Sequence, residues 1–172
     1  RVLMRALLRR LDRIIVHGNP AVATARSLGV DESRIDQESL PSPWPAGSDG
    51  PSRSTKRTPG PTRFLFFGTI RKYKGLDFLL SALADVPEVT LTVAGEFWDD
   101  KQPYLDQIQA LGLESRVTLR PGYVAEEDFG TVFGSHDVLV LPYRSGTGSI
   151  VRELAFQHGL PVIATDVGAI AE

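Results

Sequence analysis

The chain has 172 residues, no cysteine, a net charge of −2, and 42% hydrophobic and 23% charged residues. This composition is typical of a globular protein with one core-forming domain and an additional segment. The lack of cysteine excludes disulfides and thiolate metal sites and favours a cytoplasmic location, and no apolar run reaches the roughly 18 residues of a membrane span.

Residues 1–63 carry eleven Lys and Arg against six Asp and Glu, whereas residues 64–172 carry eight against fifteen. An acidic domain argues against a nucleic-acid partner, so any bound anion should be small and held at a local basic point.

The N-terminal residues predict a helix, a strand and a second helix. Residues 1–13 place five arginines among aliphatic residues at helical spacing. We expect a helix with a solvated basic face packed on protein; a helix at an anionic membrane surface, giving peripheral membrane contact, stays open as an alternative. Residues 14–18 predict a short strand, and residues 19–30 a helix with Pro20 in its first turn and Gly29 at its end.

Residues 43–62 are dense in proline, glycine and serine and nearly free of aliphatic side chains. Such a stretch buries too little surface to order itself, so we expect a linker. The predicted organisation is a remnant of an N-terminal domain over residues 1–42, the linker over 43–62, and a main domain over 63–172. Because the chain starts at an arginine and stops shortly after an apolar run, we expect both ends to be cut and the main domain to be incomplete at its C-terminus.

From residue 63 onward, short apolar runs alternate with segments of helical periodicity. This alternation predicts an α/β fold with a parallel sheet covered on both faces, and right-handed crossovers make such a sheet doubly wound. Ligands of these sheets bind outside the carboxyl ends of the strands, so the residues after each run are the candidates for a site. The predicted strands are residues 63–68, 89–95, 116–124, 137–143 and 161–165, and the predicted helices are residues 75–86, 100–113, 125–136 and 148–159.

The segment after the first run, residues 68–75 (GTIRKYKG), matches neither the dinucleotide fingerprint nor a phosphate-binding P-loop. It brings three cations, Arg71, Lys72 and Lys74, to the mouth of an otherwise acidic domain. They are either solvated loop charges or a clamp for a phosphate group, for which Arg offers bidentate contact and Lys a point charge.

The segment after the fourth run, PYRSGTGSIVRELAF over residues 142–156, joins a strand to a helix. Gly146 and Gly148 allow the backbone to approach a ligand, and the exposed N–H groups of a helix start favour an anion. Ser149 or Thr147 alternatively caps this helix. Glu153 follows one turn later; it is either an ordinary exposed residue or the acceptor of two ribose hydroxyls. Together the two segments favour a nucleoside diphosphate.

These segments resemble the C-terminal, donor-binding half of group 1 (family 4) glycosyltransferases with the GT-B fold. The resemblance implies a Rossmann-like half of such an enzyme, preceded by a short helix-strand-helix remnant. It is carried by residues 64–83, 91–124 and 136–168 and, more weakly, by residues 11–18.

The resemblance implies roles for individual residues. Lys74 matches the lysine that contacts the donor diphosphate; Thr69 stands where the family has an arginine, and Arg71 is the candidate replacement. Glu153 matches the glutamate that holds the ribose, whereas Ser145 replaces the first motif glutamate, so no catalytic residue is assigned. The implied donor-binding residues are Gly68, Thr69, Arg71, Lys74, Tyr123, Val124, Ser145, Gly146, Thr147, Gly148, Ser149 and Glu153, with Gly122, Tyr123 and Val124 near the nucleobase.

The implied reaction is hexosyl transfer from a nucleotide-diphospho-sugar to a glycan or lipid-linked acceptor in cell-envelope or polysaccharide synthesis, with retention of configuration. We expect this chain to bind the donor weakly and to be inactive alone, in the cytoplasm or at the inner face of the membrane. The resemblance implies neither a cofactor nor a metal. The histidines agree, because His17, His136 and His158 lack metal-ligand spacing and are expected at the surface or at helix ends.

Two other functions stay open. A sugar-nucleotide epimerase of the GT-B fold would bind the same diphosphate, with catalytic carboxylates from another domain. A non-catalytic binding or scaffold protein is favoured by Ser145 and Thr69, whereas Lys74 and Glu153 argue against it. Glu96, Trp98 and Asp166 also follow strands and are candidates for shaping the donor-sugar pocket; for Trp98 we expect loop packing instead.

Overall fold

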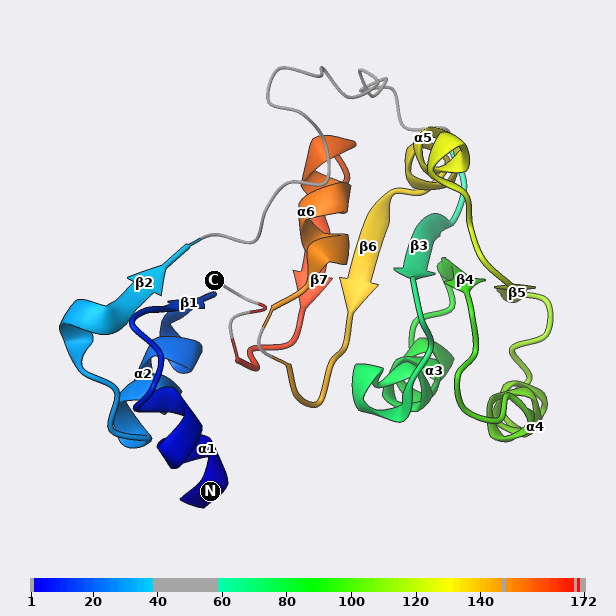
Figure 1. Ribbon diagram of the computed structural model, residues 1–172. Coiled ribbons are helices and arrows are strands. Elements are labelled where there is room, and N and C mark those ends of the chain that lie inside the picture. Colours follow the sequence, from blue (N-terminus) through cyan, green and yellow to red (C-terminus); the bar gives the residue numbers. More distant parts are fainter. Residues whose placement is uncertain (1, 39–58, 147, 169, 171–172) are drawn as a thin grey trace.

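The structure is a computed structural model that describes residues 2–38, 59–146, 148–168 and 170. Its main unit is a five-stranded sheet in the order β5-β4-β3-β6-β7, with every neighbouring pair parallel (Figure 1). The strands are β3 (Thr62–Phe67), β4 (Val89–Gly95), β5 (Val117–Pro121), β6 (Val138–Leu141) and β7 (Val162–Ala164). The five strands predicted from the apolar runs are therefore confirmed.

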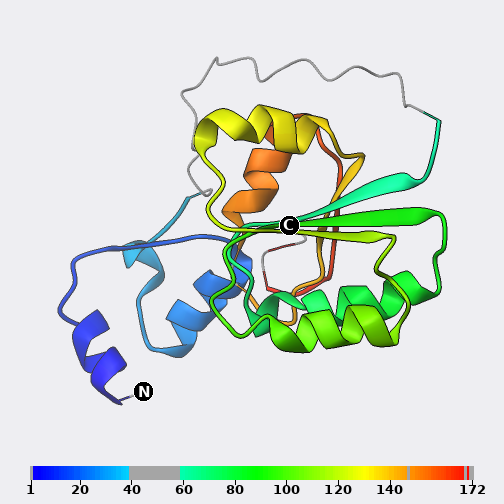
Figure 2. The same cartoon turned by 90° about the vertical axis from the view of Figure 1, so that its right-hand side faces the viewer.

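The helices cover both faces of this sheet. Figure 2 shows α3 (Leu76–Ala84) and α4 (Gln102–Ala110) on one face and α5 (Phe129–Gly134) and α6 (Ile150–Gln157) on the other. Two short 3₁₀ turns, η2 (Lys72–Lys74) and η3 (Glu126–Asp128), precede α3 and α5. The doubly wound α/β fold is thus confirmed, and the strand order reverses between β3 and β6, which is where such folds bind ligands.

Strand β3 shows why the apolar runs are continuous. Side chains of successive strand residues point to opposite faces. Phe64 and Phe66 pack with the core under α3 and α4, and Leu65 and Phe67 with the core under α5 and α6. Leu65 and Phe66 are each at most 1% exposed. A strand covered on both sides must be apolar at every position, and this removes the alternation of a half-exposed strand.

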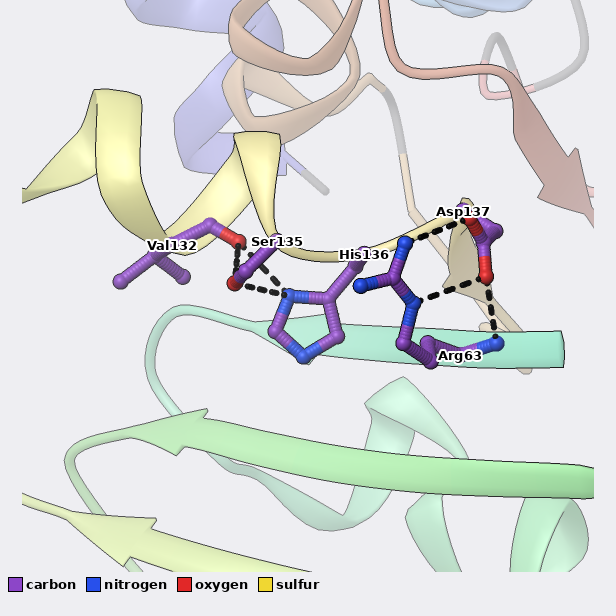
Figure 3. Close-up of polar contacts among 5 residues, drawn as sticks. All are labelled: Arg63, Val132, Ser135, His136 and Asp137. Carbon is purple, nitrogen blue, oxygen red and sulfur yellow. Dashed lines mark hydrogen bonds and ion pairs between the residues drawn. The ribbon is translucent and has the colours of Figure 1, made fainter. Parts of the chain in front are cut away.

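Asp137 joins the amino ends of the two central strands. It precedes β6 and accepts hydrogen bonds from the backbone N–H of Arg63 at 2.9 Å and from its guanidinium at 2.9 and 3.1 Å (Figure 3). The neighbouring His136 contacts the carbonyl oxygen of Val132 through Nδ1 at 2.6 Å. This polar cluster lies at the amino edge of the sheet, opposite the carboxyl edge at which ligands of such folds bind.

Two of the histidines lie at helix ends, as expected, but both are buried. His136 and His158 lie at the ends of α5 and α6 but are only 5% and 6% exposed, because each packs into the layer of helices. His158 stacks on the Phe133 ring with centroids 5.1 Å apart. His17 is half-buried, and its Nδ1 lies 2.9 Å from the carbonyl oxygen of Glu38.

The N-terminal residues form a smaller unit with a parallel two-stranded sheet, beside the β7 end of the main sheet in Figure 1. It contains α1 (Val2–Leu8), β1 (Ile14–Val16), α2 (Asn19–Ser27), the 3₁₀ turn η1 (Glu32–Arg34) and β2 (Ile35–Gln37). Strand β2 was not predicted, and α1 is shorter than the predicted helix over residues 1–13. Helix α1 has no buried residue. The Arg34 guanidinium donates to the carbonyl oxygens of Leu8, the last residue of α1, and of Asp12, which follows the helix.

The predicted linker lies mostly outside the described residues, which exclude 39–58, and Thr62 already begins β3. Among the described residues, no helix is long and apolar enough to cross a bilayer.

Candidate functional site

The two segments singled out from the sequence lie together at the carboxyl edge of the sheet, because β3 and β6 are neighbours. The backbone N–H of Arg144 donates to the carbonyl oxygen of Tyr73 at 2.8 Å. The Arg144 guanidinium also pairs with the Asp77 carboxylate at 2.7 Å. The segment after β3 is thus joined directly to the segment after β6.

Glycine is required where these segments meet. Gly75 has φ 72°, and a Cβ added to it would lie 2.0 Å from the carbonyl oxygen of Pro142. Gly95 is similar, because a Cβ there would lie 2.0 Å from the carbonyl oxygen of Gly68. Any other residue would push the loops apart, so both glycines determine the shape of this edge.

Lys74 is the central charged residue of the site. It is only 6% exposed, and its Nζ lies 3.4 Å from Thr69 Oγ1 and 5.5 Å from the centre of the Tyr143 ring. Burial, reinforced by the nearby Arg71 charge, lowers the pKa of Lys74 to about 8. In the described part of the chain, no carboxylate forms an ion pair with Lys74. A buried ammonium without a counter-charge is costly, and an anionic ligand would supply that charge.

Arg71 lies beside Lys74 but is oriented by another loop. Its guanidinium carbon is 4.0 Å from the centre of the Trp98 ring. The Trp98 indole N–H in turn donates to the Glu96 carboxylate at 3.3 Å. Trp98 is 58% exposed, so it holds Arg71 more than it packs its own loop. The loop-packing expectation for Trp98 therefore needs this correction.

The N-terminus of α6 completes the site. Ser149 occupies the N-cap position, yet its side chain caps no backbone N–H. Its hydroxyl instead lies 3.4 Å from the Tyr143 hydroxyl, and burial raises the pKa of Tyr143 to about 12. A Cβ added to Gly68 would lie 3.4 Å from Val151 and 3.5 Å from the Lys74 ammonium, so α6 begins close to the buried cation. The first N–H groups of α6 therefore lie on the side of the Lys74 charge, an arrangement that favours an anion.

Glu153 is not in contact with these cations. Its Oε1 accepts hydrogen bonds from Arg152 Nε at 3.0 Å and Nη2 at 2.9 Å. Arg152 also donates to the carbonyl oxygen of Ile170 at 2.9 Å. Glu153 is half-buried one turn into α6, whereas Ser145 is exposed.

The remaining predicted site residues lie farther from Lys74 or cannot be placed. Tyr123 is 82% exposed, and Val124 packs at the edge of the core under α5 and α6. Gly146 and Gly148 are half-buried. Thr147 lies outside the described residues. The described residues contain no group of side chains that could hold a metal ion.

The sequence reasoning did not assign two residues that the structure places in the site. Tyr143 supplies the ring next to the Lys74 ammonium, and Arg152 holds the Glu153 carboxylate. The only signal for Tyr143 is its place directly after an apolar run. For Arg152 there is no signal, because adjacent residues of a helix do not ordinarily face each other.

A model of the family described as "Glycosyl transferases group 1" matches residues 61–172. The chain belongs to the group 1 glycosyl transferases. Among group 1 relatives, D-inositol 3-phosphate glycosyltransferase of Mycobacterium sp. (strain JLS) is 30% identical over 168 residues, which is 92% of this chain and 38% of the relative. A GDP-mannose:glycolipid 4-beta-D-mannosyltransferase of Xanthomonas campestris pv. campestris is 31% identical over 111 residues, which is 60% of this chain and 30% of that protein.

Solved structures show the same fold. HepE of Anabaena, in complex with UDP and glucose, superposes with a TM-score of 0.76 at 20% identity, covering 98% of this chain and 48% of that one. Sucrose-phosphate synthase from Thermosynechococcus elongatus gives 0.75 at 23% identity, covering 97% and 44%. The chain is thus a Rossmann-like part of the GT-B fold, and it spans less than half the length of these relatives.

Proposed function

We propose that this chain binds the diphosphate of a nucleotide sugar and belongs to a retaining hexosyltransferase that acts on a glycan or lipid-linked acceptor in the cytoplasm. The observation that carries the proposal is the buried Lys74 ammonium. It lies at the point where the strand order reverses, beside the start of α6, and no described carboxylate pairs with it.

The chemistry of this edge suits a departing diphosphate. Lys74 and Arg71 supply two positive charges, and the first turn of α6 supplies backbone N–H donors. These groups are in place before the reaction, so stabilising charge on the leaving group requires little reorganisation. The proposal needs no metal ion, because the cations themselves offset the charge of the phosphates.

Glu153 is proposed to hold the ribose. Its Oε2 forms no hydrogen bond among the described residues, whereas Oε1 is held by Arg152. A carboxylate whose one oxygen is held by Arg152 can accept hydrogen bonds from two ribose hydroxyls on its other oxygen. Arg152 is then a positioning residue that fixes the direction of the carboxylate.

The relatives do not agree on one donor. HepE was solved with UDP, whereas the Xanthomonas relative is named for GDP-mannose. We therefore propose the nucleoside diphosphate as the shared chemistry. The names of the relatives support inositol phosphate, glycolipid or glycan acceptors for the whole protein.

The direct test is calorimetric titration of the chain with UDP, GDP and ADP. We expect one of them to bind. Lys74→Met should weaken that binding by about tenfold or more, because it removes a charge-assisted contact to phosphate. Glu153→Gln should cost about 1–3 kcal/mol through the lost charged hydrogen bond to ribose.

Lys101→Met is the matched control, because Lys101 is an exposed lysine outside the site. Its affinity for the nucleotide should equal that of the wild type. Equal losses of affinity in both lysine variants would mean that Lys74 acts only through the net charge of the chain and does not contact the nucleotide. No binding of any nucleotide by a folded sample would reject the proposed site.

A non-catalytic nucleotide-sugar-binding protein is the second candidate. It is favoured by the exposed Ser145 at the position of the first motif glutamate and by Thr69 at that of the arginine. Hydrolysis or transfer of the bound nucleotide sugar by the full-length protein separates the two. Binding without any turnover would favour the second candidate.

A further inference from the structure

A second cavity, of about 320 Å³, opens between the N-terminal ends of α3 and α4. It shares no residue with the proposed donor-binding set. Helices α3 and α4, whose N-terminal ends line it, lie on the sheet face opposite α6 (Figure 2). Its volume is at the lower end of the range for small-molecule sites, about 300–1,000 Å³. The lining residues are Lys72, Asp77, Asp99, Asp100, Pro103, Tyr104 and Gln107.

Tyr104 contributes a buried polar group to this cavity. Its side chain is 6% exposed and its ring packs against Phe97. The hydroxyl forms no hydrogen bond within the described part of the chain, although it lies in the field of two carboxylates. Burial, followed by the nearby Asp77 and Asp99 charges, raises the pKa of Tyr104. The hydroxyl is not sealed from solvent, so it is available to form a hydrogen bond with a ligand in the cavity.

Asp77 adds a second unsatisfied atom. Its Oδ2 pairs with Arg144, but its Oδ1 is buried and has no hydrogen-bond partner among the described residues. Asp99 and Asp100 each use one oxygen to accept a backbone N–H, from Lys72 at 3.0 Å and from Gln102 at 2.9 Å. The other oxygen of each carboxylate accepts no hydrogen bond from a described residue. Asp99 and Asp100 are exposed, so these oxygens are the acceptors that the cavity offers to a ligand, whereas Asp77 Oδ1 is sealed from it.

The charges around the cavity nearly cancel. The three carboxylates are offset by Lys72, by Arg144 on Asp77, and by the positive ends of the α3 and α4 dipoles. A cationic ligand would thus find little net attraction, and a phosphate would meet three carboxylates. The described residues offer no metal-binding group here. A neutral ligand with many hydroxyl donors fits this balance.

The surface of the cavity also suits a sugar ring. Pro103 and the Tyr104 ring present apolar surface beside the acceptors. A pyranose has apolar C–H faces and hydroxyls around its rim, so one face can pack while the rim donates to carboxylates. We propose that this cavity is an accessory carbohydrate site that takes one neutral, hexose-sized sugar unit. It is separate from the nucleotide-sugar site and does not depend on it.

The test is saturation-transfer NMR on the folded chain with the methyl glycosides of glucose, mannose and galactose as probes. At least one probe should receive saturation through its ring protons. Tyr104→Phe removes only the hydroxyl oxygen and should reduce this transfer about threefold or more, since it deletes a hydrogen bond to the sugar. Its melting temperature should equal or exceed that of the wild type, because the lost hydroxyl has no protein partner.

Tyr73→Phe is the matched control, because Tyr73 packs on Tyr143 outside the cavity; it should leave the transfer unchanged. Asp99→Asn tests the acceptors, because the amide oxygen can still accept the Lys72 N–H while one acceptor becomes a donor.

Saturating UDP should not displace the probe; displacement would put the sugar in the donor site and overturn the proposal. It would equally be overturned by no transfer with any probe, by equal transfer in Tyr104→Phe, or by butylammonium binding in place of the sugars.

Discussion

Lys74 combines two properties that oppose each other. It is buried beside an aromatic ring and a hydroxyl, which stabilise an ammonium poorly, yet its position at the switch point of the sheet suits an anion. Burial of this charge should reduce the stability of the free protein and increase the affinity for a diphosphate. Such an exchange of stability for binding is common at functional sites.

Replacement of Lys74 by Met should therefore stabilise the free protein at pH 7 by about 1–3 kcal/mol, since a pKa shift is a difference in stability. The folded-state pKa is about 8 and the ordinary value is 10.5. Between these values the unfolded chain binds more protons, so wild-type stability rises with pH. Urea unfolding from pH 7 to 10 should show the advantage of Lys74→Met shrinking. A constant advantage would show that the charge is not its cause.

At the scale of elements, close approach of loops shapes the site. Gly75 lies against Pro142, Arg144 bridges to Asp77, and Tyr73 meets the Tyr143 ring edge-on at 5.9 Å. Each contact joins a residue between η2 and the first turn of α3 to one after β6. The opposite edge of the same strands is joined by Arg63 and Asp137 (Figure 3). The two central strands are thus held together at both ends, which keeps Lys74 next to the start of α6.

Gly75→Ala should test this close approach, with Gly112→Ala as the control. Both glycines have positive φ, 72° and 63°, but a Cβ on Gly112 would meet nothing within 4 Å. Gly112→Ala should cost about 1 kcal/mol for the left-handed backbone alone. Gly75→Ala should cost about 3–4 kcal/mol because the loops must also separate. Equal costs in thermal unfolding would mean that the collision with Pro142 relaxes freely.

At the scale of the whole molecule, the layer formed by α5 and α6 buries two histidines, His136 and His158. His158 stacks on Phe133, and neither of its ring nitrogens has a hydrogen-bond partner within the described part of the chain. Burial lowers the pKa of His158 and also that of His136. Both rings are held in their neutral form in the core under α5 and α6. The folded state therefore resists protonation more strongly than the unfolded chain does.

Acid should destabilise the protein for this reason. The unfolded chain takes up protons on these histidines below a pH of about 6.5, whereas the folded state does so only at lower pH. The free energy of unfolding should therefore fall as the pH is lowered from 7 towards the folded pKa values. His158→Phe should reduce the fall measured by urea unfolding at pH 7 and 5. His17→Gln is the control outside this core, and an unchanged fall in His158→Phe would contradict the prediction.

The sequence by itself determined the class of fold and the position of the two main loops. A strand buried on both faces has to be apolar throughout, so runs such as residues 64–67 can be recognised locally. Helical periodicity and glycines mark where each strand gives way to a loop. The motif around Lys74 and the turn before Glu153 were found in this way, because each is contiguous in the chain.

Only the tertiary structure decided what these residues contact. The order of the strands places β3 beside β6, and this puts Tyr143 next to Lys74 and leaves no described carboxylate paired with it. Strand β2 exists through its pairing with β1, since its residues Asp36 and Gln37 carry no strand pattern. The Tyr104 cavity likewise depends on how α3 and α4 pack. Local patterns report the backbone and burial of one segment, whereas partners and burial between distant segments arise only when the chain has folded.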